Sequence, residues 1–105
     1  MDFEWDDDKA DENTRKHAID FDEAALVFLD PHRVEKEDTR KDYGEERFQV
    51  VGFSAGRILL VVYTERGERI RLISARKATR RERRLYENAF GSQEPEERED
   101  GLGTS

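Results

Sequence analysis

The residues of this sequence best suited to chemistry are basic side chains concentrated in one short stretch. Residues 69–84 carry eight basic side chains and a single acidic one, Glu82. Guanidinium groups bind phosphate through paired, charge-assisted hydrogen bonds, so several of them on one surface would hold a polyanion. The stretch therefore predicts a site for an anionic partner, and RNA is the leading candidate. Its basic residues are Arg69, Arg71, Arg76, Lys77, Arg80, Arg81, Arg83 and Arg84.

The two halves of this basic stretch are expected to differ. In a regular strand over residues 69–76, Arg69 and Arg71 share one face and Arg76 points to the other. Residues 80–84 fall on a helix, where arginines equally often form a solvated face that is neutralised by local acids or by a partner protein. Phosphate binding is therefore better supported for the strand arginines than for the helix arginines.

Three further residues could take part in proton transfer or phosphate binding. His17 could act as a general acid or base near neutral pH. A histidine in the last turn of a helix is more often explained by the helix dipole, which favours a cation there. Glu45 and Arg47 lie two positions apart in an expected strand, so they could orient a ribose hydroxyl and a phosphate, or pair with each other. Possible base-stacking or acid groups are Tyr43, Tyr63 and Tyr86.

Composition limits the classes of function. The chain has 105 residues, 43% of them charged and 34% hydrophobic, with no cysteine. No disulfide or thiolate metal site is possible, and we expect no cofactor, because no glycine-rich phosphate loop, metal-ligand cluster or serine triad stands out. No apolar run is long enough for a membrane span, and the acidic N-terminus lacks the pattern of a secretory signal. We expect a soluble, cytoplasmic protein that does not contact membranes.

The net charge of −7 is unevenly distributed along the chain. Residues 1–12 have a net charge of −6 and residues 91–105 of −4, which leaves +3 for residues 13–90. A phosphate group approaching the middle of the chain would therefore meet a basic surface, although the protein as a whole is acidic.

Two helices are predicted near the N-terminus, after a possible short strand over residues 3–5. Asp6 is a favourable N-cap for a helix that ends at about His17. This helix has few apolar residues and should cover the edge of the domain. Asp20 is the N-cap of a second, amphipathic helix, which Asp30-Pro31 ends.

Strands are predicted in the middle of the chain. Residues 46–53, 57–64 and 69–76 are rich in β-branched and aromatic residues and are separated by turns of hairpin length. Residues 58–63 are apolar throughout, which indicates a central strand covered on both faces. Residues 33–38 could add a polar edge strand. We therefore expect an antiparallel sheet of three to four strands.

The C-terminal part is predicted to contain one helix and a tail. Residues 79–82 form a capping box for the helix, which Gly91 ends. Residues 91–105 are too polar to offset their ordering entropy, so we expect a disordered acidic tail after a single domain over residues 1–90. The fold class is α+β: two N-terminal helices, the antiparallel sheet and a C-terminal helix, with the helices against one sheet face.

Several short motifs, in their order along the chain, resemble the BrnT toxin family. The most specific is RLISARKA at residues 71–78, followed by Glu82, Arg83 and Tyr86. Together the motifs span about residues 3–90, and their order is more specific than any one of them. Ala18 departs from the pattern, because glycine, which tolerates positive φ, is frequent there. The other matching segments are FEWD at 3–6 with Lys9, Asn13, Lys16 and His17, FDEAA at 21–25, FLD at 28–30, GEERF at 44–48 and VG at 51–52.

The resemblance implies a ribonuclease toxin of a type II toxin–antitoxin pair with a RelE-like fold. It also implies a BrnA-type antitoxin with a ribbon-helix-helix domain, held in a hetero-oligomer that reaches promoter DNA only through the antitoxin. We expect metal-independent RNA cleavage by attack of the ribose 2′-hydroxyl on the adjacent phosphate. Candidate phosphate-binding residues are Arg47, Arg71 and Arg76. Candidate proton-transfer residues are His17 and Glu45, with Tyr63 as a further possibility.

A second class of function is also compatible with the sequence. The chain could be a non-enzymatic interaction subunit or co-repressor whose basic face docks an acidic partner. Cleavage of RNA by the purified protein distinguishes the two, and a neighbouring reading frame for a ribbon-helix-helix protein would support the toxin.

Overall fold

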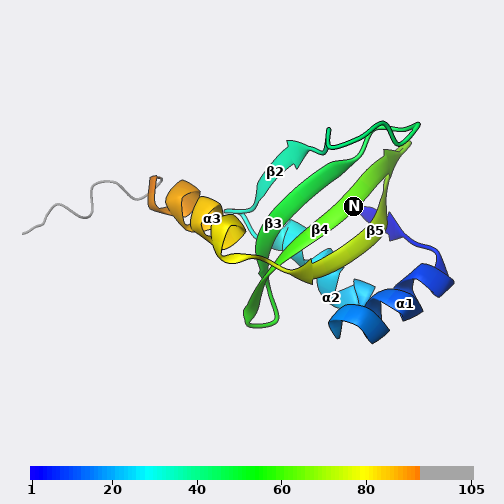
Figure 1. Cartoon of the computed structure of the whole chain (residues 1–105), viewed down its shortest axis with the longest axis horizontal. Coiled ribbons are helices and arrows are strands. Elements are labelled where there is room, and N and C mark those ends of the chain that lie inside the picture. Colours follow the sequence, from blue (N-terminus) through cyan, green and yellow to red (C-terminus); the bar gives the residue numbers. More distant parts are fainter. Residues whose placement is uncertain (93–105) are drawn as a thin grey trace, which may run out of the picture.

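A computed structural model describes the backbone of residues 1–92 and the burial and contacts of the side chains of residues 1–89 (Figure 1). The predicted disordered tail lies almost wholly outside the described residues. The elements in chain order are β1 (Asp2–Glu4), α1 (Asp7–His17), α2 (Phe21–Ala25), the 3-10 helix η1 (Leu26–Leu29), β2 (Val34–Glu37), β3 (Phe48–Ser54), β4 (Arg57–Arg66), β5 (Arg69–Lys77) and α3 (Arg80–Ser92).

The sheet is mixed and has five strands, in the order β1-β5-β4-β3-β2. The predicted meander of antiparallel strands is confirmed for β2 to β5. The expectation of a three- to four-stranded, wholly antiparallel sheet is wrong, because β1 adds a fifth strand that pairs in parallel with β5. The sequence indicated a possible short strand over residues 3–5, but three residues are too few to show with which strand they pair.

The first helix forms where its caps predict. The Asp6 carboxylate accepts hydrogen bonds from the backbone amides of Asp8 and Lys9 at 2.9 and 3.2 Å. The helix ends at Ala18, which has φ +58° and ψ +35°, the left-handed conformation for which glycine is best suited. Asn13, the only buried residue of α1, forms hydrogen bonds with both the amide and the carbonyl of Ala75 and so fastens the helix to the edge of β5.

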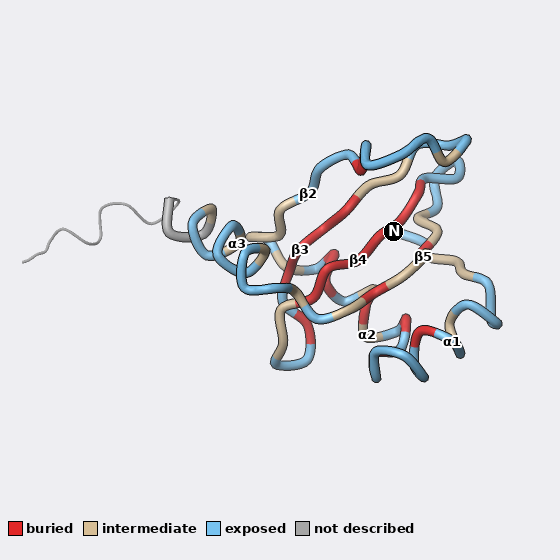
Figure 2. Tube along the Cα trace, viewed as in Figure 1, coloured by how far each residue is buried: buried red, intermediate tan, exposed pale blue. Residues whose placement is uncertain are grey.

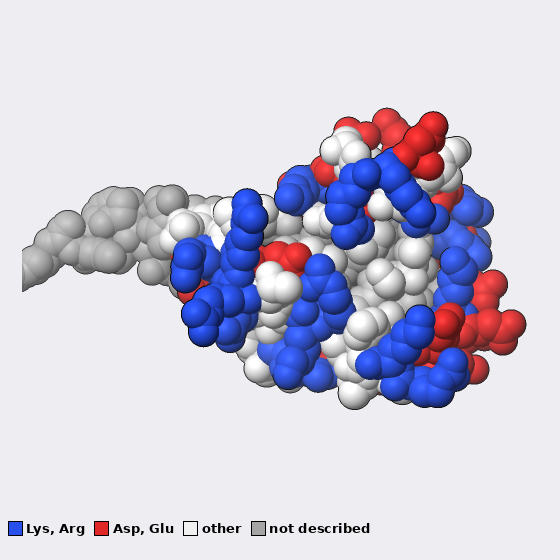
Figure 3. Space-filling view, viewed as in Figure 1, with Lys and Arg blue, Asp and Glu red and all other residues white. Residues whose placement is uncertain are grey.

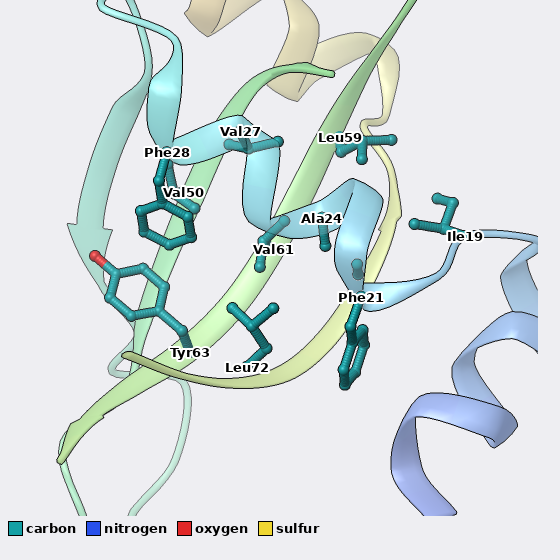
Figure 4. Packing of buried hydrophobic residues seen from close by; sticks show 11 residues of the cluster. Ile19, Phe21, Ala24, Val27, Phe28, Val50, Leu59, Val61, Tyr63 and Leu72 are labelled. Atoms are coloured by element: carbon teal, nitrogen blue, oxygen red, sulfur yellow. The ribbon is translucent and has the colours of Figure 1, made fainter. Parts of the chain in front are cut away.

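The main core lies between the sheet and the segment that contains α2 and η1 (Figures 2 and 4). This helical segment is continuous over the predicted range but changes from α to 3-10 geometry after Ala25. Gly52 permits its close approach, because a Cβ there would lie 2.8 Å from Val27 Cγ1. The main buried apolar residues are Ile19, Phe21, Ala24, Val27, Phe28, Val50, Leu59, Val61, Tyr63, Leu72 and Ala75.

The last helix packs on the opposite face of the sheet, so the prediction that all helices share one face is wrong. Figure 1 shows α2 behind the sheet and α3 beside β2 and β3. A second small cluster, centred on Val51, Leu60 and Val62, joins this face to Tyr86 of α3. The apolar residues of β4 therefore serve two cores, which explains why the strand has no alternation. The helix also continues through Gly91, where the sequence had predicted its end.

Candidate functional site

A β-bulge in β5 brings arginines from both ends of the strand to one face. The register between β4 and β5 shifts once, where β5 has an extra residue. Arg71 pairs with Thr64 on one side of the shift. Arg76 pairs with Leu60 on the other side, four positions away in β4 and therefore on the same face. The prediction that Arg76 points away from Arg69 and Arg71 is wrong, because it assumed a regular strand.

The resulting surface, on the α3 side of the sheet, is here called the basic face. Arg66 at the end of β4 pairs across the strands with Arg69. Arg47 joins them just before β3, since Arg47 and Arg66 both contact the carboxylate of Glu45. In Figure 3, Lys and Arg side chains surround an uncharged area on this face. The basic face consists of Arg47, Arg66, Arg69, Arg71 and Arg76.

The two β5 arginines expected to bind phosphate are each held by a carboxylate. Arg71 donates to Glu4 at 2.9 Å. Arg76 donates to both oxygens of Glu82, at 2.8 and 3.0 Å, in a two-pronged pair. These hydrogen bonds lower the pKa of Glu4 and of Glu82 below the ordinary glutamate value. The guanidinium groups are therefore oriented before any ligand arrives.

Glu82 has a second role that the sequence indicated. Its carboxylate accepts from the amide of Thr79 at 2.9 Å, and the Thr79 hydroxyl accepts from the amide of Glu82 at 3.2 Å. This is the predicted capping box of α3. One carboxylate therefore fixes both the start of the helix and the guanidinium of Arg76.

Glu45 and Arg47 pair with each other at 3.3 Å, one of the two outcomes expected for them, but they lie in the loop before β3 and not in a strand as predicted. The guanidinium of Arg47 also lies 4.2 Å from the centre of the Tyr43 ring, a cation–π arrangement. The loop that carries them is anchored by the buried carboxylate of Asp38, which accepts hydrogen bonds from the side chains of Arg40 and Tyr43. The bonds from Arg40 hold the pKa of Asp38 well below its usual range.

His17 lies at the opposite edge of the basic face from Glu45. It is exposed at the end of α1 and lines a hollow of about 180 Å³ beside Ile73 and Ser74 of β5. The other lining residues are Lys9, Asn13 and the ion pair of Glu12 with Lys16. Among residues 1–92, His17 has no hydrogen-bond or ion-pair partner. Its imidazole is therefore available to a ligand that enters this hollow.

The candidate residues form a row across the basic face and not a single cluster. Arg47 and Glu45 lie near Arg66, at one end of the sheet. Arg71 and Arg76 follow along β5. Their partners in β4, Thr64 and Leu60, are four residues apart. At about 3.3 Å per strand residue, the backbones of the two arginines are therefore about 13 Å apart. Such spacing fits contacts with successive groups of an extended chain better than a clamp on one ion.

The structure removes one candidate and adds two. Tyr63 is buried in the main core, on the opposite face, where its hydroxyl donates to Glu35 at 2.6 Å. Its burial on that face excludes Tyr63 from the basic face. Burial and this hydrogen bond also raise the pKa of Tyr63 far above the ordinary tyrosine value. Glu4, which orients Arg71, and Ser74, which borders the hollow of His17, lie within the motifs FEWD and RLISARKA, but the sequence assigned neither of them a role. The contact of Glu4 with Arg71 depends on the pairing of β1 with β5, which the motif does not indicate.

The helix arginines differ from those on β5. Arg80, Arg81, Arg83 and Arg84 are all exposed, and within the described residues none of their side chains forms an ion pair. No acid among the described residues neutralises them through an ion pair. Their charge is available to a ligand or to a partner protein.

Metal and membrane features are not found in the described part of the chain. No group of three or more His, Cys, Asp or Glu residues there could hold a metal ion. No helix there is long and apolar enough to cross a bilayer.

The fold and the face together define a class: a small α+β protein with a row of pre-oriented arginines on a sheet, suited to an extended polyanion. Residues 5–82 match the model of a family described as the ribonuclease toxin BrnT of a type II toxin–antitoxin system. The chain belongs to this family, which confirms the resemblance seen in the motifs. A comparison with curated proteins finds no match.

Proposed function

We propose that this protein is a metal-independent endoribonuclease that cleaves RNA on its basic face. Family membership supplies the ribonuclease class. The observation that supports this location is the shared face of Arg71 and Arg76, which are both pre-oriented by carboxylates. The exposed His17 lines a hollow beside Ser74, which lies between them in the same strand. The exposed uncharged area between the arginines leaves room for a strand of RNA.

In the proposed reaction, the ribose 2′-oxygen attacks the adjacent phosphorus. The new bond from the 2′-oxygen to phosphorus forms as the bond from phosphorus to the 5′-oxygen breaks. A base accepts the proton of the 2′-hydroxyl, an acid protonates the departing 5′-oxygen, and the product ends in a 2′,3′-cyclic phosphate. Arg47, Arg71 and Arg76 bind successive phosphates of the strand, and the guanidinium at the reacting phosphate stabilises the charge that develops on the phosphoryl oxygens.

His17 is the better supported of the two proton-transfer candidates. Both Arg47 and Arg66 contact the carboxylate of Glu45, at 3.3 and 3.5 Å, so its oxygens are already engaged. His17 is exposed and unengaged in the described part of the chain, beside β5. We assign proton transfer to His17. We assign to Glu45 the role of positioning Arg47.

We further propose the biological setting that the family implies. The partner is a BrnA-type antitoxin with a ribbon-helix-helix domain, and the two form a hetero-oligomer that binds promoter DNA only through the antitoxin. The toxin acts in the cytoplasm, has a RelE-like fold, and arrests translation and growth by cutting RNA. The free arginines of α3 are available either to the RNA or to this partner.

Incubation of the purified protein with a labelled RNA, with and without chelator, tests the proposal. We expect equal cleavage in both conditions and a cyclic phosphate end. Loss of cleavage with chelator would refute the metal-free reaction. No cleavage in either condition, together with tight binding of an acidic protein partner, would favour a non-enzymatic interaction subunit.

A further inference from the structure

An exposed aromatic side chain lies on the basic-face side of the sheet, beyond Arg76. Phe53 is 51% exposed, although it occupies a strand. It pairs with Ile58 of β4, two residues from Leu60, the partner of Arg76. Because alternate residues of a strand share a face, Phe53 and Arg76 project from the same side of the sheet.

Phe53 forms one wall of a hollow of about 480 Å³ between the β3–β4 hairpin and the start of α3. Three cationic residues, Arg57, Lys77 and Arg83, also line this hollow. Arg57 is paired with Glu23 at 2.7 Å. The side chains of Lys77 and Arg83 form no ion pair with any described residue, so within this part of the chain their charges are not neutralised.

The walls of this hollow are fixed to one another through Asp30. Its carboxylate accepts a hydrogen bond from the backbone amide of Phe53 at 2.9 Å and from the hydroxyl of Tyr86 at 2.6 Å. The end of β3 and the helix α3 are therefore tied to the same anion. A ring held in this way is presented to solvent by the fold and does not depend on a loose loop.

We propose that Phe53 is a stacking platform for a base of single-stranded RNA, next to the phosphate held by Arg76. Lys77 and Arg83 contact the phosphates on either side of that base. A ring bordered by unpaired cations has the composition of single-strand binding sites, in which bases stack and the backbone follows positive charge. A purely apolar protein contact would gain nothing from those charges. This inference rests on the proposed function and names the subsite that sets the position of the strand.

The test compares four variants of the full chain: Phe53→Ala, Phe53→Leu, Phe53→Trp and, as a control, Leu26→Ala. Leu26 is 48% exposed but lies in η1, on the other side of the sheet. We expect Phe53→Ala and Phe53→Leu to raise the KM for an RNA oligonucleotide by about tenfold, with kcat nearly unchanged, since stacking of one base is worth a factor of this order. Leu26→Ala should match the wild type.

Phe53→Trp provides a direct reading of stacking. The chain has one natural tryptophan, Trp5, which packs against Phe21 on the other side of the sheet. Addition of a non-cleavable 2′-deoxy analogue should quench the fluorescence of the Phe53→Trp protein and leave the wild-type signal unchanged. Unchanged fluorescence would overturn the inference.

Two further outcomes separate this inference from the proposed function. If the wild type cleaves RNA and Phe53→Ala has a normal KM, the stacking platform is wrong and the proposed function stands. If Phe53→Leu has a normal KM but Phe53→Ala loses the antitoxin complex, the ring serves a protein contact and the inference is overturned. Failure of the wild type to cleave RNA would refute the proposed function itself.

Discussion

The strand half and the helix half of the basic stretch use the same residue type in opposite ways. On β5, Arg71 and Arg76 are each held by a carboxylate, from Glu4 and Glu82. On α3, four arginines are exposed and form no ion pair with a described residue. An arginine held in place offers a defined geometry, which matters for chemistry at one phosphate. A free arginine offers mainly long-range attraction, which matters for capture and is screened by salt.

The largest expected effect is on the strand half. Replacement of Arg76 by alanine should lower kcat for RNA cleavage by about 10²- to 10³-fold, the usual loss for one pre-oriented donor to a charged transition state. Arg80→Ala, an exposed and unpaired arginine of α3, is the matched control and should change kcat less than twofold. Equal losses in the two variants would show that the halves are not functionally distinct.

A smaller loss is expected when the orientation of Arg76 is relaxed. Glu82→Gln keeps a side chain that can complete the capping box but removes the ion pair. We expect kcat to fall by about tenfold, because Arg76 becomes free to adopt other rotamers. Thr79→Ala, which removes the cap and leaves the ion pair, should lower stability by about 1 kcal/mol without changing kcat. A normal kcat in Glu82→Gln would show that Glu82 serves only the helix.

The same variant has a pH signature. The pKa of Glu82 is lowered in the folded state, chiefly by its hydrogen bonds from Arg76, so the carboxylate stabilises the fold above the unfolded-state pKa of about 4.3. That contribution is lost as the pH falls through the lower folded-state pKa. The stability difference between wild type and Glu82→Gln, measured by denaturant unfolding, should be constant from pH 7 to 5 and shrink below about pH 4. A difference that does not depend on pH would contradict the ion pair.

The helix half should affect capture and not chemistry. Changing Arg80, Arg81, Arg83 and Arg84 together to glutamine should weaken RNA binding at low salt and leave kcat near the wild-type value. The slope of log affinity against log salt should fall by about 0.7 for each lost phosphate contact. If the slope is unchanged and only antitoxin binding is weakened, the helix half belongs to the protein partner.

The smallest effect concerns the scaffold that presents His17 to β5. Ala18 has φ +58° at the end of α1, so Ala18→Gly should raise the free energy of unfolding by about 0.5–1 kcal/mol. The control is Ala10→Gly, within the same helix, which should lower it by about 1 kcal/mol. Both variants can be followed by thermal unfolding. No gain from Ala18→Gly would mean that the positive φ is not strained.

Local signals in the sequence predicted most elements. The caps at Asp6, Asp20 and Thr79 predicted the helices, and the apolar runs predicted β3, β4 and β5, because each signal is contained within a few residues. The polar segment 33–38 was predicted only as a possible edge strand, and it forms β2. The resemblance at residues 71–78 gave the family, and the two-residue spacing of Glu45 and Arg47 gave their pairing.

The features that were missed depend on contacts between distant segments. The parallel pairing of β1 joins residues 67 positions apart, as in the contact of Glu4 with Arg71. The bulge that turns the side chain of Arg76 to the face of Arg71 is a property of β4 and β5 together. The position of α3 depends on the hydrogen bond from Tyr86 to Asp30, which are far apart in the sequence. Local periodicity carries none of this information.

Single-turnover cleavage at saturating protein tests the central claim most directly, because it measures chemistry after the RNA has been captured. The account predicts that the Arg71→Ala/Arg76→Ala double variant loses at least about 10³-fold in rate in the presence of chelator. The variant with all four α3 arginines changed to glutamine should cleave at the wild-type rate. A double variant as fast as the wild type, or an α3 variant as slow as the double variant, would contradict the assignment of catalysis to the strand half.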